Sequence, residues 1–241
     1  MMGHSHAVSG ALLWLAVAPI TSVAIGQPLP LPQIAAGTIA CAGAALLPDL
    51  DHPSALAART FGPLTQLMAK GISMLAGGHR QGTHTIAFCV GVAAAVWVTT
   101  LWAPPLATTI IMWLLVGLGF KGLHLSSRGQ GFGAFITNGV VAASIVWAIN
   151  TWMPQSYTWL WLAVLIGSIA HLLGDALTPE GVPFFAPLTQ TRFALPIIPH
   201  TSHWLEVAFL TPLMAAGALL LAWVNYGQTN LDLLPKSIPF L

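Results

Sequence analysis

The sequence predicts an all-α fold, a polytopic membrane bundle of six or seven transmembrane helices. The first observation behind this prediction is composition: of 241 residues, 56% are hydrophobic and only 5% are Asp, Glu, Lys or Arg, against roughly 25% in an ordinary soluble domain. So few charges cannot cover a water-exposed surface, so most of the exterior must face lipid. No repeat or low-complexity tract divides the chain, and we expect a single domain over 1–241.

The second observation is a series of apolar stretches as long as a membrane crossing, which takes about 20 residues of helix. Segments containing proline, such as GQPLPLPQ, APP and MPQS, separate several of them. The second stretch is short and the third and fourth are joined tightly, so the count is six or seven. The candidates are 7–25, 33–48, 84–103, 105–121, 134–153, 157–177 and 205–225.

The segment from Pro53 to Arg80 lies between the second and third candidates. It places Arg59 and Lys70 among apolar residues, which fits an amphipathic segment lying along the membrane surface. A loop helix packed on the bundle fits the same pattern equally well.

Basic residues indicate the orientation. If the seven stretches cross alternately, six of the seven Lys and Arg residues fall on the side of the N-terminus, and only Lys236 falls on the other. The six are Arg59, Lys70, Arg80, Lys121, Arg128 and Arg192. By the positive-inside rule, the N-terminal side is cytoplasmic. A formal net charge of +1 argues against nucleic acid as a partner.

Histidines gather on the same side. The alternating topology brings eight of the nine to or near the cytoplasmic face. These are His4, His6, His52, His79, His84, His124, His200 and His203. The ninth, His171, lies near the cytoplasmic end of the sixth candidate helix. Such clustering indicates that a site is built on this face.

The motif HLLGD is the clearest candidate. It places His171 and Asp175 four residues apart, hence on one face of a helix. An imidazole and a carboxylate one turn apart can bind the same cation. A buried His–Asp hydrogen bond is the alternative, but ionisable residues within membrane segments are usually functional.

The motif LLPDLDHP supplies Asp49, Asp51 and His52. In an extended segment the two aspartates point to opposite sides, so we do not expect all three residues to reach one metal. A polar helix end is the alternative. It is weakened because aspartate is unfavourable at a helix C-terminus, where the dipole is negative. A nearby cation would remove that conflict.

The motif GGHRQGTHT supplies His79, Arg80 and His84. Thr83 is a candidate N-cap for the third helix, which would put His84 at the helix start. There the dipole favours a neutral imidazole, the form that a metal needs. The alternative is a surface turn without chemistry.

Three further residues are candidates. His6 directly precedes the first helix and can close a metal site. Glu206, at the start of the seventh helix, is a candidate ligand or general base, as is Glu180 in TPEGVP.

Together these motifs predict a divalent metal centre of one to three ions. Ligation by His and Asp with almost no sulfur suits zinc first, and also manganese or iron. The predicted ligands are His6, Asp49, Asp51, His52, His79, His84, His171 and Asp175. The predicted catalytic residues are Asp51, Arg80 and Glu206.

Four of these stretches also resemble a known family. HAVSG, LLPDLDHP, GHRQGTHT and AHLLGDALTPEGVPFFAPLTQTRFALPI resemble, in this order over about 6–206, the YdjM-type family of inner-membrane metal-dependent hydrolases. The resemblance implies a bacterial inner-membrane location. In ligand order alone, the chain is distantly similar to the zinc-dependent phospholipase C and single-strand nuclease superfamily. The matching residues are His6, Asp49 or Asp51, His84 or His79, and His171 with Asp175.

These observations predict a hydrolase at the cytoplasmic membrane interface. Its metal would activate water to cleave a phosphoester of a lipid or other amphiphile, with membrane lipids as partners. Arg80 or Arg192 could neutralise the phosphate charge. One alternative is a metal-ion or proton transporter, which would need polar residues through its helix midsections. The other is a regulatory membrane protein with a structural metal site, closed by protein ligands.

Overall fold

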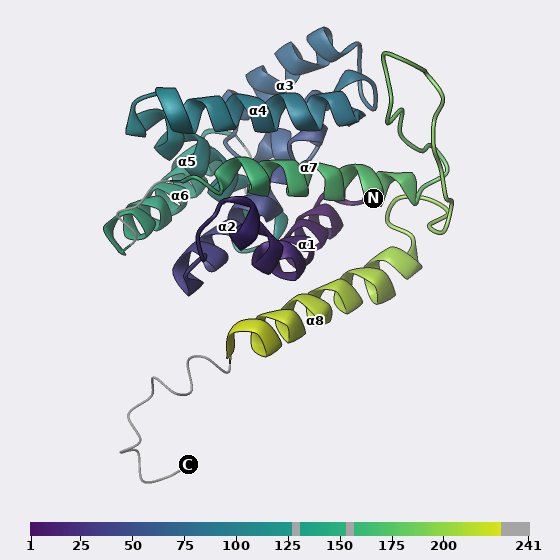
Figure 1. The fold of residues 1–241 in the computed structure, drawn as a ribbon. Helices are drawn as coiled ribbons and strands as arrows, with labels where there is room; N and C mark the ends of the chain where they lie inside the picture. Colours follow the sequence, from purple (N-terminus) through teal and green to yellow (C-terminus); the bar gives the residue numbers. More distant parts are fainter. Residues whose placement is uncertain (127–130, 153–156, 228–241) are drawn as a thin grey trace.

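The protein is a bundle of helices (Figure 1). A computed structural model describes residues 1–126, 131–152 and 157–227. The helices are α1 (Gly3–Ala24), α2 (Leu31–Ala44), α3 (Pro63–Ala76), α4 (Ile86–Trp102), α5 (Pro105–Gly122), α6 (Phe132–Trp152), α7 (Leu160–Ala176) and α8 (Thr211–Ala222). Within the described residues there is no β-strand; Val182 and Phe193 only exchange two backbone hydrogen bonds in the loop after α7.

All seven predicted apolar stretches are helical, which confirms a polytopic helical bundle. Among the described residues, five helical segments are long and apolar enough to cross a membrane: α1, Leu31–Asp51, α5, Phe132–Thr151 and Leu205–Gly227. The last consists of α8 and the π-helical turns on either side of it. The other two, α4 and α7, are shorter, with 17 residues each, or about 26 Å at 1.5 Å per residue.

Proline begins several of these helices. Pro32, Pro63 and Pro105 each occupy one of the first two positions of α2, α3 and α5. The first N–H groups of a helix have no partner within it, so a residue without an N–H costs nothing there. The prolines that interrupt the apolar pattern therefore mark where the next helix starts.

Helix α2 lies at the centre and packs against α1, α5 and α7. Glycines permit the close approach. A Cβ on Gly43 would lie 1.9 Å from the carbonyl oxygen of Leu115 in α5, and one on Gly119 would lie 2.4 Å from that of Ile39 in α2. Small residues of this kind let membrane helices pack backbone to backbone. The segment that follows α2 is thereby held in the middle of one end of the bundle.

Helix α3 lies outside this central packing. Its Thr65 and Ala69 are buried, whereas Leu67, Met74 and Leu75 are exposed. The helix ends at Gly77, whose φ of +78° gives the left-handed conformation of a helix cap. The sequence predicted an amphipathic segment here, and α3 has both a buried face and an exposed apolar face.

One end of the bundle collects four segments that carry the candidate motifs. They are the first turns of α1, the 3-10 turn Pro48–Asp51 after α2, the stretch between α3 and α4, and the last turns of α7. Figure 1 shows the N-terminus beside the end of α7, next to the long loop that leads to α8.

Candidate metal centre

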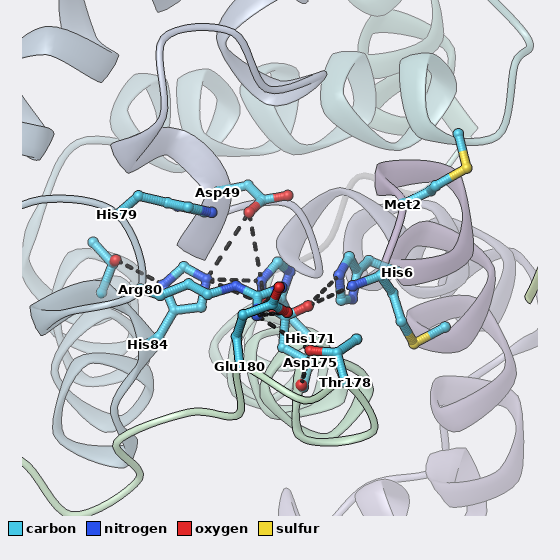
Figure 2. Close-up of polar contacts among 12 residues, drawn as sticks. Met2, His6, Asp49, His79, Arg80, His84, His171, Asp175, Thr178 and Glu180 are labelled. Carbon is cyan, nitrogen blue, oxygen red and sulfur yellow. Dashed lines mark hydrogen bonds and ion pairs between the residues drawn. The ribbon is translucent and has the colours of Figure 1, made fainter. Parts of the chain in front are cut away.

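Six of the predicted ligands form a compact cluster at this end. Three groups of side chains each bring ligand atoms within 4.8 Å of one another. The groups are His6, Asp49 and His171; Asp49, His79 and His84; and His84, His171 and Asp175. Figure 2 shows His84, His171 and His6 following one another across the view, with Asp49 on one side and Asp175 on the other. All six were among the predicted ligands.

His171 is oriented by the backbone of α2. Its Nδ1 donates to the carbonyl oxygen of Ala45 at 2.8 Å, because a carbonyl can only accept. Its Nε2 therefore carries the lone pair. This atom lies 3.2 Å from Nε2 of His84 and 3.7 Å from an oxygen of both Asp49 and Asp175. Metal-ligating histidines are typically fixed in this way by a hydrogen bond from the other ring nitrogen.

Asp51 orients the second pair of histidines. Its carboxylate is fully buried and accepts from Nδ1 of His79 (2.7 Å), from the backbone N–H of Arg80 (3.2 Å) and from the hydroxyl of Thr83. Nδ1 of His84 lies 3.0 Å from the same hydroxyl, whose oxygen can accept from it while its proton goes to Asp51. Both histidines thus keep Nε2 free to face the cluster.

The segment around Asp49 and Asp51 is a 3-10 turn rather than the extended segment we expected. Pro48 begins the turn, and Leu50 is buried beneath it. The two carboxylates still point apart. The side chain of Asp49 is 16% exposed and faces the cluster. The carboxylate of Asp51 instead contacts Nδ1 of His79, on the side of that ring away from the cluster. No described grouping includes Asp51 or His52 as a ligand; His52 lies near the hydroxyl of Ser54, 2.8 Å away.

The imidazole of His6 is the side chain that most strongly indicates an ion at the site. It lies within α1, not ahead of it, and is 1% exposed, stacked on His171 with ring centroids 3.8 Å apart. Neither ring nitrogen has a hydrogen-bond partner, although Nε2 is 3.2 Å from Asp175. A buried polar atom without a partner is costly. An ion between His6 and its neighbours would supply the missing interaction.

Asp175 is held between positive and polar groups. One oxygen accepts from the amino group of Met1 at 2.7 Å, and the other lies 3.1 Å from the guanidinium of Arg80. The second oxygen is also 3.5 Å from Nε2 of His84. The carboxylate is 2% exposed, so these partners offset the cost of burying its charge.

Arg80 connects the cluster to the solvent. Its φ of +58° is uncommon for a residue with a side chain, and its guanidinium bridges Asp175 and the exposed carboxylate of Glu180 at 3.0 Å. Burial alone would raise the pKa of Glu180, but the positive charge of Arg80, together with hydrogen bonds from its own backbone, Thr178 and Arg80, lowers it below the usual value. Arg192 donates to the backbone oxygens of Arg80 and Glu180, so both predicted arginines lie at the edge of the site.

Without a metal, His84 favours its protonated form. Burial alone would lower its pKa, but hydrogen bonding to Asp175 and Asp51 raises it to about 9. Histidine must be neutral to bind a metal ion. An ion at this position therefore has to displace a proton from His84.

Glu206, predicted as a catalytic residue, lies apart from the three groupings. One of its oxygens accepts from the backbone N–H of Met2, and the other from that of Ser202 at 3.0 Å. The side chain is fully buried. Both oxygens are thus engaged in joining the start of α1 to the segment before α8.

Sequence reasoning missed two groups that position the histidines. Thr83 was predicted to cap the third helix, but α4 begins at Ile86 and Thr85 caps it, accepting from the N–H of Phe88. Thr83 instead donates to Asp51. The carbonyl of Ala45 was also missed, because a backbone acceptor leaves no signal in a sequence pattern.

The donor set suits a divalent metal. It offers four imidazoles and two carboxylates, with no sulfur within the described cluster. Imidazole and carboxylate are ligands for zinc, manganese or iron. Asp49 belongs to two of the groupings and could bridge two ions. The two described cysteines, Cys41 and Cys89, are buried among the helices and outside the groupings.

Comparison with known proteins identifies the family of the chain. No curated protein and no solved structure matches the chain significantly. The family model described as YdjM inner membrane protein matches residues 1–126 and 133–232, which include all six residues of the cluster. The chain therefore belongs to the YdjM family of inner membrane proteins.

Proposed function

We propose that the protein is a membrane-embedded hydrolase that uses a divalent metal to cleave a phosphoester of a lipid. The observation that carries this proposal is the cluster itself. Nε2 of His84 and Nε2 of His171 each lie 3.5–3.9 Å from an oxygen of Asp49 and of Asp175. His6 is buried beside them with Nε2 3.2 Å from Asp175, and neither of its ring nitrogens makes a hydrogen bond. Such an arrangement is costly as a structural feature alone and fits an ion.

The candidate ligands are His6, Asp49, His79, His84, His171 and Asp175. Zinc is the first choice for them, with manganese or iron as the others. A bound divalent ion would lower the pKa of a water molecule toward 7 and polarise a phosphoryl oxygen. Asp49 and His79 are the ligands that retain exposure, at 16% and 36% of their side chains.

Arg80 supports a phosphate-bearing substrate. Its guanidinium is 13% exposed and lies 3.1 Å from Asp175, close to where the reacting group would sit. One of its interactions is with Glu180, whose side chain is 61% exposed and whose pairing is weak in solvent. A phosphate could replace that carboxylate and form the charge-assisted, bidentate pair that arginine favours.

The position of the cluster supports a lipid substrate. The ligands come from the ends of membrane helices α1, α2 and α7 and from the start of α4. A phosphoester at that level of a bilayer belongs to a head group. The excess of Lys and Arg on this side supports the cytoplasmic face.

The test begins with the metal. Purified protein should contain at least one transition-metal ion per chain by elemental analysis. The double variant His171→Ala, Asp175→Ala should lose it, because losing even an outer partner of a ligand costs about 10- to 100-fold in affinity and losing a ligand costs more. His200→Ala, His203→Ala is the matched control, since these rings lie outside the groupings. Full metal content in the first variant, with helix content unchanged, would contradict the site.

Activity is then measured on a panel of lipid phosphoesters in vesicles. A chelator should stop hydrolysis, and added Zn²⁺ or Mn²⁺ should restore it. A soluble phosphodiester should react much more slowly. The same vesicles report metal flux, and flux without any hydrolysed product would favour a transporter and overturn the enzyme.

A further inference from the structure

An apolar groove lies between α7 and α8, with α1 as its floor. Its volume is about 780 Å³. Its lining includes Leu12 and Ala16 of α1, Leu173 and Gly174 of α7, and Leu210 and Met214 at the start of α8. Phe184 and Phe193 of the loop after α7 close its upper end. Figure 1 shows α8 crossing below α1, away from α7.

The upper end of the groove borders the metal centre. Gly174 lines the groove and directly precedes Asp175. A Cβ at this glycine would lie 2.8 Å from Sδ of Met1 and 3.0 Å from Nδ1 of His6. The groove and His6 are thus separated only by the backbone of Gly174 and the flexible side chain of Met1, which also lines the groove.

The lower part of the groove runs along the membrane-spanning helix α1. From Ser9 to Ala16, both of which line it, α1 advances about 10 Å at 1.5 Å per residue. Ala16 is exposed, as is Leu173 on the opposite side. The groove therefore opens to the lipid-facing surface at one end, and at the other end the backbone of Gly174 and the side chain of Met1 separate it from His6.

We infer that this groove takes the hydrocarbon chain of the lipid whose phosphoester is cleaved. The inference rests on the proposed function and names the substrate as a long-chain phospholipid-like molecule that enters sideways from the bilayer between α7 and α8. An apolar chain fits the lining, and the head group of a molecule seated this way reaches the level of Asp175 and Arg80.

A second groove provides an internal comparison. It has a volume of about 920 Å³ and lies between α1, α2 and α8, with Leu15, Ala35 and Ala218 in its lining. It is also apolar, but its lining includes no candidate ligand and no residue next to one. Bilayer lipid can cover it, yet a lipid there would not present its head group to the cluster.

The test uses photo-crosslinking, which does not depend on activity. The full-length, metal-loaded protein is placed in vesicles of phosphatidylethanolamine and phosphatidylglycerol. These contain a small fraction of a phospholipid with a diazirine at the end of one acyl chain. After irradiation, labelled peptides are identified by mass spectrometry. We expect several-fold more label on 9–16 and 210–214 than on the α2 residues that line the second groove.

Two matched variants sharpen the result. Ala16→Trp fills the lower part of the first groove, and Ala35→Trp places the same side chain in the second; both alanines are exposed on membrane helices. Ala16→Trp should reduce labelling of 9–16 and 210–214 several-fold, whereas Ala35→Trp should not. Equal labelling of both grooves, or labelling unaffected by Ala16→Trp, would overturn the inference.

Hydrolysis measured on the same samples separates the two proposals. Ala16→Trp should slow cleavage of a long-chain lipid several-fold more than that of a short-chain analogue, with metal content unchanged. Groove-specific labelling without hydrolysis of any phosphoester would leave the lipid site standing and refute the hydrolase. Normal hydrolysis with no groove-specific labelling would refute the groove.

Discussion

The histidines of the cluster differ in how they are held, and the difference assigns their roles. His171 is fixed by a backbone carbonyl and His79 by Asp51, each through Nδ1. His6 has no such partner. Asp51 is thus a positioning residue in this geometry, since its acceptors are taken up by His79, Arg80 and Thr83. The sequence predicted it as a ligand and a catalytic residue, and that role stays a prediction.

Substituting Asp51 tests this reading. Asp51→Asn replaces one acceptor oxygen with an NH₂ group, which cannot accept from the Thr83 hydroxyl or the Arg80 N–H. His79 and His84 should lose their fixed orientation, and metal affinity should fall about 10- to 100-fold, as for other partners of metal ligands. Competition with a fluorescent chelator measures the affinity, and circular dichroism checks the fold.

The matched control is Ser54→Ala. It removes the hydroxyl that lies 2.8 Å from His52, a histidine outside the ligand groupings. Metal affinity should not change. An Asp51→Asn protein that binds metal as tightly as the unsubstituted chain would show that Asp51 does not orient the ligands.

Local spacing made part of this site predictable. His171 and Asp175 share a helix face because they are four residues apart, and the sequence alone shows that. The role of Asp51 is different, because its partners lie 28 to 32 residues away along the chain. Which of two neighbouring aspartates turns inward depends on the turn that Pro48 begins, and the extended segment we expected gave no means of deciding it.

At the scale of elements, α2 determines where the ligands meet. Its carbonyl at Ala45 orients His171, and the turn after it carries Asp49. Hydropathy predicted the seven apolar helices because lipid imposes the same requirement on each crossing. It could not predict that α2 is central, since that depends on glycines at specific crossings such as Gly43 with α5.

The crossing of α2 and α5 gives a test of this packing. A Cβ on Gly119 would lie 2.4 Å from the backbone oxygen of Ile39, which cannot move away easily. Gly119→Ala should therefore destabilise the protein, by about 1–3 kcal/mol as for other overpacked positions. Gly91→Ala in α4 is the control, because nothing lies within 4 Å of a Cβ there. Thermal unfolding in detergent should show a lower midpoint for the first variant alone; equal midpoints would contradict the close α2–α5 contact.

At the scale of the whole molecule, alternating chain direction builds the site. Residues from His6 to Asp175 meet because α1 begins, α2 ends, α4 begins and α7 ends at one end of the bundle. Counting crossings in the sequence was enough to place the motifs on a common side. The groove beside them was not predictable, because its walls come from helices α1, α7 and α8, whose packing leaves no periodic signal.

The same alternation predicts the topology, which depends on α4 and α7. At 17 residues each, they are at the lower limit of about 17–25 residues for a crossing helix. If both cross, there are seven crossings, and the chain ends on the side opposite the metal centre.

Reporter fusions at Leu241 and within 122–132 should then give opposite signals, and a fusion between Pro28 and Pro32 should match the one at Leu241. With seven crossings, six of the seven basic residues would fall on the side of the cluster, although Arg128 and Lys236 lie outside the described residues. The fusion within 122–132 should therefore report the cytoplasm. Matching signals at Leu241 and within 122–132 would mean an even number of crossings between these two points, in which case α7 does not span the bilayer. Matching signals between Pro28 and Pro32 and within 122–132 would show the same for α4.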